Sequence, residues 1–264
     1  MHLLHEEMNL IVPHHIYPSE VVPMPQLPDQ RISGTAFFPG GLGLYLEDRR
    51  LDRVLFPFHG VMVLGHNFDC ENNFKNSQRH GRERLTSGTW ARLLRILRTA
   101  EVPLDRCFFT NAFVGLCRGN SNLDYKGRTD AWFRAACISF LQRQIRYQRP
   151  NMIITLGRYV PPLLAELSVT LNQWKRCEQK DPSVMLKEMD VNPIVREAIV
   201  DLGDGSQHTT TVVPLAHASL PNNRWRRPVG YANGENGEIQ LVQAAWAVSQ
   251  TQAEMKNCVH TAVL

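Results

Sequence analysis

Four short, strongly apolar segments are spread along the chain. They are Val61–Leu64, Cys107–Phe109, Met152–Leu156 and Thr211–Leu215. Each segment is rich in β-branched or aromatic residues and lacks an alternation of apolar and polar positions. This pattern is typical of strands that are buried on both faces, as in a parallel sheet. The segments therefore predict four parallel strands.

Helical patterns lie between these strands and after the last one. Ser87 is expected to cap a helix with one apolar stripe, and Thr129 to cap a second helix that Pro150 ends. A shorter helix is predicted after Pro161, and a last helix from about Glu238. The stripe of the first helix consists of Trp90, Leu93, Leu94 and Leu97. Strands that alternate with helices predict an α/β fold of three layers, α/β/α, around a mainly parallel four-stranded sheet.

Two regions depart from this alternation. Residues 1–50 include a proline- and glycine-rich stretch and are expected to form an N-terminal arm, wrapped on a single domain at 51–264. Residues 172–208 form a polar, charged insertion in that domain. Within the insertion, Asp204-Gly205 is expected to make a hairpin turn that places Ala198–Leu202 beside the fourth strand.

Composition limits the class of protein. A chain of 264 residues with 43% hydrophobic residues can bury a substantial core. No apolar run approaches the roughly 20 residues of a membrane span, and the first residues include acidic side chains, so a cytoplasmic protein without a membrane partner is expected. The six cysteines are scattered without a C-x-x-C pair, which favours free thiols over a zinc ribbon or a disulfide framework.

Positive charge is concentrated in three clusters. The net charge is +4, and basic residues gather at Arg79–Arg84, Arg118–Arg128 and Arg224–Arg227, each after a predicted strand. One cluster of this kind is usually a solvated loop. Three clusters at comparable positions favour a shared anionic ligand.

Polar residues follow the predicted strands. Parallel strands end at the same edge of an open sheet, and ligands bind outside that edge. His66, Asn67 and Asp69 follow the first strand, Asn111 follows the second, and His217 follows the fourth. We therefore expect these side chains to converge on one rim.

Three motifs at these exits resemble those of the uracil-DNA glycosylase superfamily. Gly65-His66-Asn67 is similar to the G-x-[DN] motif after the first strand of that family, Thr110-Asn111-Ala112 to its asparagine-bearing motif, and His217-Ala218-Ser219 to its H-P-S motif. The motifs occur in the family's order, and the resemblance spans about residues 60–250. It implies the fold of that family and a DNA glycosylase that flips a nucleotide out of DNA and hydrolyses its glycosidic bond.

The chain departs from the family pattern at several positions. Asn67 stands where the most active uracil enzymes carry a water-activating aspartate, although other branches use asparagine there. Phe68 and Ala218 replace prolines, and Asp69 replaces a tyrosine that blocks bases with a C5 substituent. The cysteine pattern of the iron–sulfur branches is absent from the sequence, so no cofactor or metal is expected.

The resemblance assigns roles to the central side chains. His217 would donate a hydrogen bond to the pyrimidine O2 as negative charge develops on the departing base. Asn67 would position the attacking water and Asp69 would accept its proton, or the two would share this role. Asn111 would read the Watson–Crick edge of the flipped base, because its amide is both donor and acceptor. From the residues alone, His217 and Asn111 can also be bonded within the fold, and Asp69 can be a helix or turn cap.

Further residues are expected around the base and the DNA backbone. Phe68 or Phe74 would stack on the extruded base, although each is at least as readily a core aromatic, and His66 would line the base pocket without a catalytic role. Leu220 would fill the gap that the flipped base leaves. Contacts to the DNA strand are expected from Ser77, Ser219, Asn222 and Arg224.

The expected substrate is a modified pyrimidine. With Asp69 in place of a bulky gate, the pocket is open toward C5 and offers an acceptor for hydroxyl groups. This suggests glucosylated hydroxymethylcytosine of phage DNA, released by a monomeric, monofunctional enzyme of antiviral defence. The alternatives are the release of uracil or a damaged pyrimidine in repair, a non-catalytic DNA-binding module of the same fold, and an enzyme that acts on free nucleotides.

Overall fold

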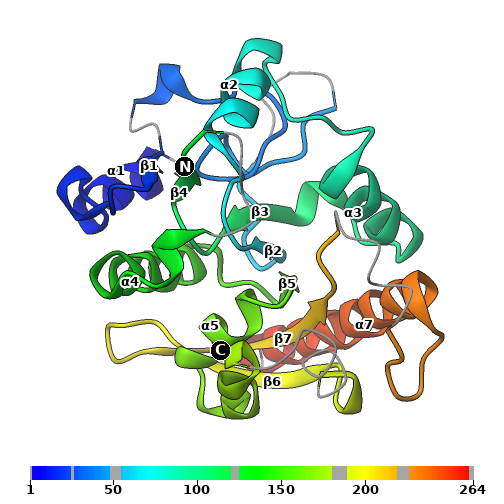
Figure 1. Ribbon diagram of the computed structural model, residues 1–264. Coiled ribbons are helices and arrows are strands. Elements are labelled where there is room, and N and C mark those ends of the chain that lie inside the picture. Colours follow the sequence, from blue (N-terminus) through cyan, green and yellow to red (C-terminus); the bar gives the residue numbers. More distant parts are fainter. Residues whose placement is uncertain are drawn as a thin grey trace.

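A mixed five-stranded sheet forms the centre of the molecule and has helices on both faces (Figure 1). The computed structural model describes residues 2–24, 27–47, 55–119, 125–179, 189–218 and 226–261. The strand order is β3-β2-β5-β7-β6. These strands are β2 (Val61–Gly65), β3 (Cys107–Asn111), β5 (Met152–Leu156), β6 (Val195–Asp201) and β7 (Gln207–Leu215).

The four apolar segments are the parallel strands β2, β3, β5 and β7. Every residue of β2, β3 and β5 is buried, as expected for strands covered on both faces. The expected number of four strands is wrong, because β6 is a fifth strand and runs antiparallel to β7. The predicted hairpin supplies it: Val200 pairs with His208 across the turn at Asp204-Gly205. As an edge strand with exposed positions, β6 lacks a continuous apolar run.

Two pairs of helices cover the sheet. α3 (Gly88–Thr99) and α7 (Gly234–Thr261) contact each other on one face, and α4 (Ala131–Gln148) lies on the other face with α1 (His2–Ile11) packed against it (Figure 1). The apolar stripe predicted for α3 is buried, which confirms the helical spacing of these residues and the face of the helix that packs inward. None of the described helices is long and apolar enough to cross a membrane.

The remaining predicted helix boundaries are close to those observed. Ser87 is the N-cap residue of α3, although its side chain makes no capping hydrogen bond. α5 (Val160–Glu166) follows β5 and has Pro161 in its first turn. α7 begins at Gly234, a turn before the predicted Glu238. Short 3-10 segments occur at η1 (His14–Ile16), η2 (Pro28–Gln30), η4 (Leu104–Arg106), η5 (Lys126–Arg128) and η6 (Val169–Gln179).

The cap of α4 differs from the expectation. Asp130, rather than Thr129, is the N-cap residue, and its carboxylate accepts the Phe133 N–H at 2.8 Å. The Thr129 hydroxyl instead donates to the Lys126 carbonyl at 3.0 Å. Aspartate is the stronger cap here because its negative charge also lies at the positive end of the helix dipole.

Nothing in the apolar pattern predicts α2 (Glu71–His80), the helix that follows the first parallel strand. It is hydrophilic, and Phe74 is its one fully buried side chain among the described residues. A helix without an apolar stripe leaves no periodic signal. Gly81 ends it in the left-handed conformation (φ 68°), which glycine adopts without strain.

The N-terminal arm covers the outer edge of β3. The Phe38 N–H donates to the Phe109 carbonyl at 2.9 Å, and the Phe109 N–H donates to the Gly43 carbonyl at 2.8 Å. β1 (Val21–Pro23) pairs antiparallel with β4 (Gly115–Cys117) beside this contact region. The arm thus satisfies backbone groups that an open sheet edge would leave exposed.

Candidate active site at the strand exits

The segments that follow β2 and β3 are joined by backbone hydrogen bonds. The Ala112 N–H donates to the Gly65 carbonyl at 2.9 Å, and the Phe113 N–H donates to the His66 carbonyl at 2.8 Å. In the parallel register, Gly65 lies opposite Asn111. The first and second predicted motifs are therefore neighbours at one edge of the sheet.

Asn111 is buried against Gly65. Its side chain is 3% exposed, and its Nδ2 donates to the Phe38 carbonyl at 3.4 Å. A Cβ atom at position 65 would lie 2.4 Å from the Asn111 Oδ1. Glycine at 65 is thus required for the amide of Asn111 to occupy this place.

Asn67 bridges its two neighbours in the loop. The His66 Nδ1 donates to the Asn67 Oδ1 at 2.9 Å, and the Asn67 Nδ2 donates to the Asp69 carbonyl at 3.2 Å. Burial lowers the pKa of His66 to about 4, although the bond to Asn67 opposes this. The His66 Nε2 is buried and has no hydrogen-bond partner among the described residues.

Asp69 adopts a conformation that is rare for residues other than glycine. Its φ is 100°, in the left-handed half of backbone space, where side chains other than glycine are strained. Its Oδ2 accepts a hydrogen bond from the Asn73 Nδ2 at 2.7 Å. The N-cap residue of α2 is Cys70, so the alternative reading of Asp69 as the cap of that helix does not apply.

His217 follows β7 and packs on the exit of β5. The Gly157 N–H donates to the Leu215 carbonyl at 2.9 Å, and a Cβ atom on Gly157 would lie 3.2 Å from the His217 Cβ and Cδ2. Burial lowers the pKa of His217, and the negative charge of Asp69 opposes this. His217 in turn contributes to the lowered pKa of His66. Because β2, β5 and β7 are parallel neighbours in the sheet, the exit of β7 with His217 lies at the same edge as the exit of β2 with His66 and Asp69.

The predicted stacking residues lie in the core. Phe68 and Phe74 are each 5% exposed and pack edge-on, with ring centroids 5.4 Å apart. Phe68 also covers Gly40, where a Cβ atom would meet its ring at 2.3 Å. Ser77 is half-buried on α2. The predicted DNA contacts at Ser219, Leu220, Asn222 and Arg224 lie outside the described residues.

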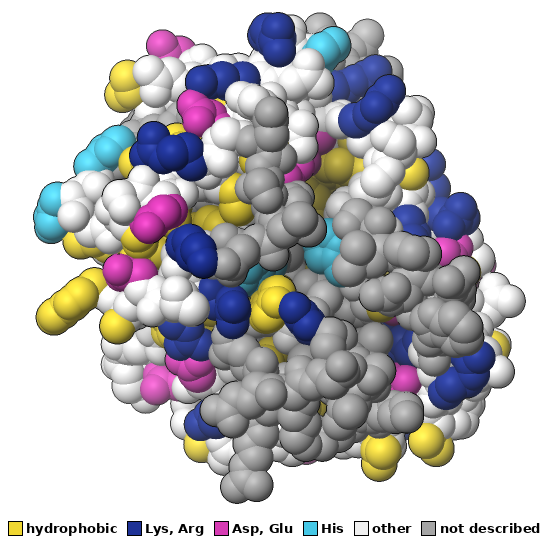
Figure 2. All heavy atoms as spheres, viewed as in Figure 1, with side chains coloured by type: hydrophobic (Ala, Val, Ile, Leu, Met, Phe, Trp, Pro, Cys, Tyr) yellow, Lys and Arg dark blue, Asp and Glu magenta, His cyan; other side chains and the backbone are white. Residues whose placement is uncertain are grey.

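Two further residues, Phe37 and Glu83, lie at the site but are not predicted from the sequence. The Phe37 ring lies 3.6 Å from the position of a Cβ atom on Gly65, and its backbone N–H donates to the Glu83 Oε2 at 2.7 Å. Burial raises the pKa of Glu83 to about 7, and the charge of Asp69 adds to this. Figure 2 shows a hollow between α2 and α3 with an apolar floor and with acidic and histidine side chains at its border. In the sequence, Phe37 belongs to the Pro/Gly-rich arm and Glu83 to a basic cluster. No spacing therefore connects either residue to the strand exits.

Aromatic and basic side chains surround His66. Its ring contacts those of Phe113 and Tyr159, with centroids 5.1 Å away in each case. The guanidinium groups of Arg128 and Arg158 lie 4.6 and 4.5 Å from the centroid of Tyr159. Arg128 belongs to the second basic cluster, so at least one of the predicted clusters borders the site.

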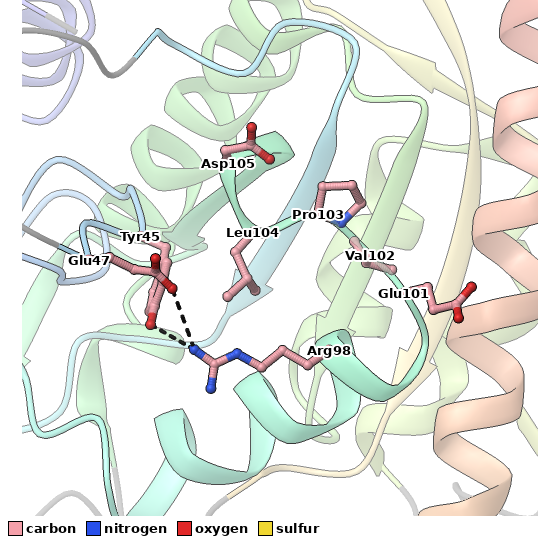
Figure 3. Close-up of a pocket in the computed structure, with 8 residues that line it drawn as sticks. All are labelled: Tyr45, Glu47, Arg98, Glu101, Val102, Pro103, Leu104 and Asp105. Atoms are coloured by element: carbon pink, nitrogen blue, oxygen red, sulfur yellow. Dashed lines mark hydrogen bonds and ion pairs between the residues drawn. The ribbon is translucent and has the colours of Figure 1, made fainter.

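A surface depression of about 550 Å³ lies elsewhere, next to the segment that precedes β3 (Figure 3). Arg98 donates to the Tyr45 hydroxyl at 2.8 Å across it. Because the depression lies at the entry of β3, it is not part of the strand-exit site. It is lined by Tyr45, Glu47, Arg98, Glu101, Val102, Pro103, Leu104 and Asp105.

In comparisons with known proteins, no family model and no curated protein matches the chain. The resemblance to the uracil-DNA glycosylases therefore rests on three short motifs.

Proposed function

We propose that the protein is a monofunctional DNA glycosylase with a uracil-DNA glycosylase-like fold, which flips a modified pyrimidine out of DNA and hydrolyses its N-glycosidic bond. The observation that carries this proposal is the meeting of three strand exits, which brings Asn67, Asn111 and His217 to one edge of the sheet. Side chains far apart in the sequence would thereby act on one extruded nucleoside.

In the proposed reaction, water adds to C1′ of the nucleotide as the bond from C1′ to the base nitrogen breaks. The bonding electron pair leaves with the base, so a donor aimed at the base oxygen stabilises the transition state. His217 suits this role, because the lowered pKa keeps its imidazole neutral with one N–H to donate. Asn67 orients the water, and Asp69 accepts its proton and returns it to the departing base.

The positive charge around the site supports DNA as the partner. Arg128 and Arg158 lie beside Tyr159, next to His66, and guanidinium groups commonly contact phosphates while aromatic rings stack on bases. The protein would act on DNA in the cytoplasm as a monomer.

The acidic side of the site supports a substrate with a hydroxyl-bearing group at C5. Asp69 stands where a tyrosine blocks such groups in the uracil-specific enzymes, and Glu83 is a second carboxyl group within electrostatic reach of it. Carboxylates accept hydrogen bonds from hydroxyl groups. Glucosylated hydroxymethylcytosine of phage DNA is therefore the proposed substrate, and antiviral defence the proposed role.

Duplexes that differ in one nucleotide test the proposal. Purified protein is incubated with DNA that carries uracil, hydroxymethylcytosine or its glucosylated form, and abasic sites and free base are measured. We expect release of the glucosylated base, slowed on the order of a hundredfold or more by Asn67→Ala or His217→Ala. His80→Ala, a change of an exposed histidine on α2, is the matched control and should leave the rate unchanged.

The other outcomes separate the competing functions. Release of uracil alone would replace the defence role with repair. Tight, salt-dependent binding of duplex DNA without release of any base would indicate a non-catalytic module. Absence of DNA binding would instead favour an enzyme that acts on free nucleotides.

A further inference from the structure

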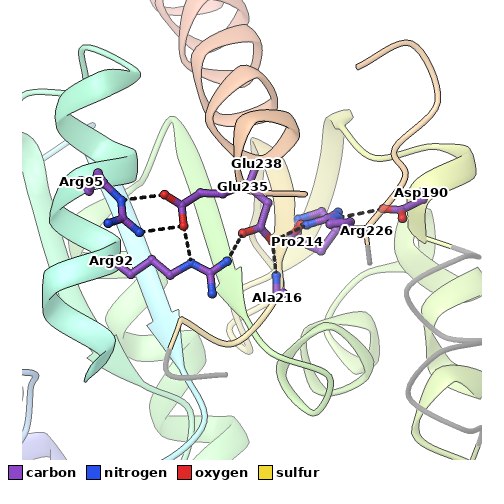
Figure 4. Close-up of polar contacts among 8 residues, drawn as sticks. All are labelled: Arg92, Arg95, Asp190, Pro214, Ala216, Arg226, Glu235 and Glu238. Atoms are coloured by element: carbon purple, nitrogen blue, oxygen red, sulfur yellow. Dashed lines mark hydrogen bonds and ion pairs between the residues drawn. The ribbon is translucent and has the colours of Figure 1, made fainter. Parts of the chain in front are cut away.

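A buried ionic cluster joins α3, α7 and the chain directly before His217 (Figure 4). Its centre is Glu238, whose side chain is fully buried. The Glu238 Oε1 accepts the Ala216 N–H at 2.6 Å and the Arg226 Nη1 at 3.2 Å, and its Oε2 accepts the Arg92 Nη2 at 3.0 Å. Donors from three segments thus hold one carboxylate.

The cluster fixes the last residues of β7 and the residue that follows. Arg226 donates to the Pro214 carbonyl and pairs with Asp190 at 2.8 Å. Ala216 is held by Glu238, and His217 is the next residue. Hydrogen bonds to charged groups are shorter and stronger than those between neutral groups. The backbone that carries the imidazole is therefore held from α7.

Arg92 is the member of the cluster whose charge acts on the His217 imidazole. It also pairs with Glu235, its Nε lying 3.2 Å from the Glu235 Oε2. Burial lowers the pKa of His217, the Asp69 carboxylate opposes this, and the positive charge of Arg92 adds to it. The charge of His217 in turn contributes to the lowered pKa of His66. A positive group behind a neutral imidazole favours donation toward developing negative charge.

We propose that Glu238 and Arg92 are positioning residues for His217, an inference that rests on the proposed glycosylase function. Glu238 fixes the backbone that orients the imidazole, and Arg92 holds the Glu238 carboxylate from α3. The two helices α3 and α7 would in this way tune a catalytic group that neither of them carries.

Histidine titration in the full chain tests this inference without a substrate. NMR of ¹³C-labelled imidazoles, assigned with His217→Gln, reports the titration midpoint. Arg92→Met removes the positive charge, so the midpoint of His217 moves to higher pH. Glu238→Gln leaves Arg92 less compensated, so the midpoint moves to lower pH. Asp204→Asn breaks an ion pair with Arg146 at the turn that precedes β7, outside the cluster, and is the control, with an unchanged midpoint.

Base release under single-turnover conditions supplies the second readout. Glu238→Ala should slow release about tenfold to a hundredfold, because a misplaced donor loses its alignment. Glu238→Gln keeps an oxygen acceptor for the Ala216 N–H and should recover most of the rate. Asp204→Asn should match the wild type. If Glu238→Ala does not fold, the titrations of the other variants still decide.

The outcomes separate this inference from the proposed function. Unshifted midpoints in both Arg92→Met and Glu238→Gln, or a wild-type rate in Glu238→Ala, would overturn the inference even if the wild type releases base. A wild type that releases no base would overturn the proposed glycosylase, while opposite shifts of the two midpoints would still support control of His217 by the cluster.

Discussion

At the scale of single residues, the site contains two half-buried titratable groups whose pKa values depart in opposite directions. Burial lowers the pKa of His66 to about 4 and raises that of Glu83 to about 7. At neutral pH the imidazole of His66 is therefore uncharged, and Glu83 is partly protonated. The two groups have opposite effects on the pH dependence of stability, so single variants separate them better than the wild-type curve does.

His66 should reduce stability in acid. Its pKa in the folded state, about 4, lies below its ordinary value of 6.5, so the unfolded chain binds the proton first as the pH falls. We expect the wild type to lose about 2 kcal/mol of unfolding free energy from this group between pH 6.5 and 4. His66→Gln should lack this loss in urea titrations at both pH values. An identical pH slope for both proteins would contradict the assignment.

Glu83 should act in the opposite direction. Its pKa in the folded state, about 7, lies above its ordinary value of 4.5, so its contribution to stability is present below pH 4.5 and is lost as the pH rises to 7. Glu83→Gln keeps an acceptor for the Phe37 N–H and has no charge to bury. We expect the variant to gain about 1–2 kcal/mol over the wild type between pH 5 and 8. A constant difference at all pH values would refute this.

At the scale of elements, the strand exits depend on close packing at glycine. Gly157 has φ 80° and lies against His217, and Gly65 lies against Asn111. A side chain at either position would displace a proposed functional group. The exit loops thus need residues that bring no Cβ atom, while the strands before them need bulky apolar residues to fill the core.

A pair of glycine variants separates the effect of backbone strain from the effect of displacing His217. Gly157 and Gly205 both have positive φ, 80° and 83°, but a Cβ atom on Gly205 meets nothing within 4 Å. Both alanine variants should lose about 1–2 kcal/mol of stability from backbone strain. Only Gly157→Ala should also slow base release, by about tenfold or more, because it moves His217. Equal rates in the two variants would show that His217 does not need its position.

At the scale of the whole molecule, the N-terminal arm belongs to the core. Phe38 is fully buried between the sheet and α4, with its ring 5.6 Å from Phe108 and 6.1 Å from Phe140. Neighbouring Phe37 reaches the site itself through Gly65 and Glu83. The same short stretch of the arm therefore contributes one side chain to the core and the next one to the site.

Two phenylalanine variants measure this contribution. Phe38→Ala should cost about 3–5 kcal/mol, since it leaves a cavity in a closely packed interior. Phe58→Ala removes a ring that is 56% exposed and should change stability by less than about 0.5 kcal/mol. Chemical denaturation of both variants checks this, and similar midpoints would mean that the arm contributes little to the fold.

Local patterns in the sequence determine the parallel strands, the helices α3, α4, α5 and α7, and the hairpin that adds β6. These elements bury one face or both, and burial leaves a periodic or continuous apolar signal. Because parallel strands end at the same edge of the sheet, the sequence also predicts that Asn67, Asn111 and His217 lie together. The polar helix α2 has no such signal, and Asp130 rather than Thr129 caps α4 because electrostatics chooses between adjacent capping residues.

Tertiary structure alone decided which other groups complete the site. Phe37 and Glu83 are joined by a hydrogen bond from the Phe37 N–H in the arm to the Glu83 carboxylate in the segment before α3. Glu238 reaches the residue before His217 from the last helix. Contacts between segments so distant in the chain follow from the packing of whole elements rather than from any local pattern. The pKa values of His66 and Glu83 were likewise beyond the sequence, because burial, which the folded chain sets, is their main cause.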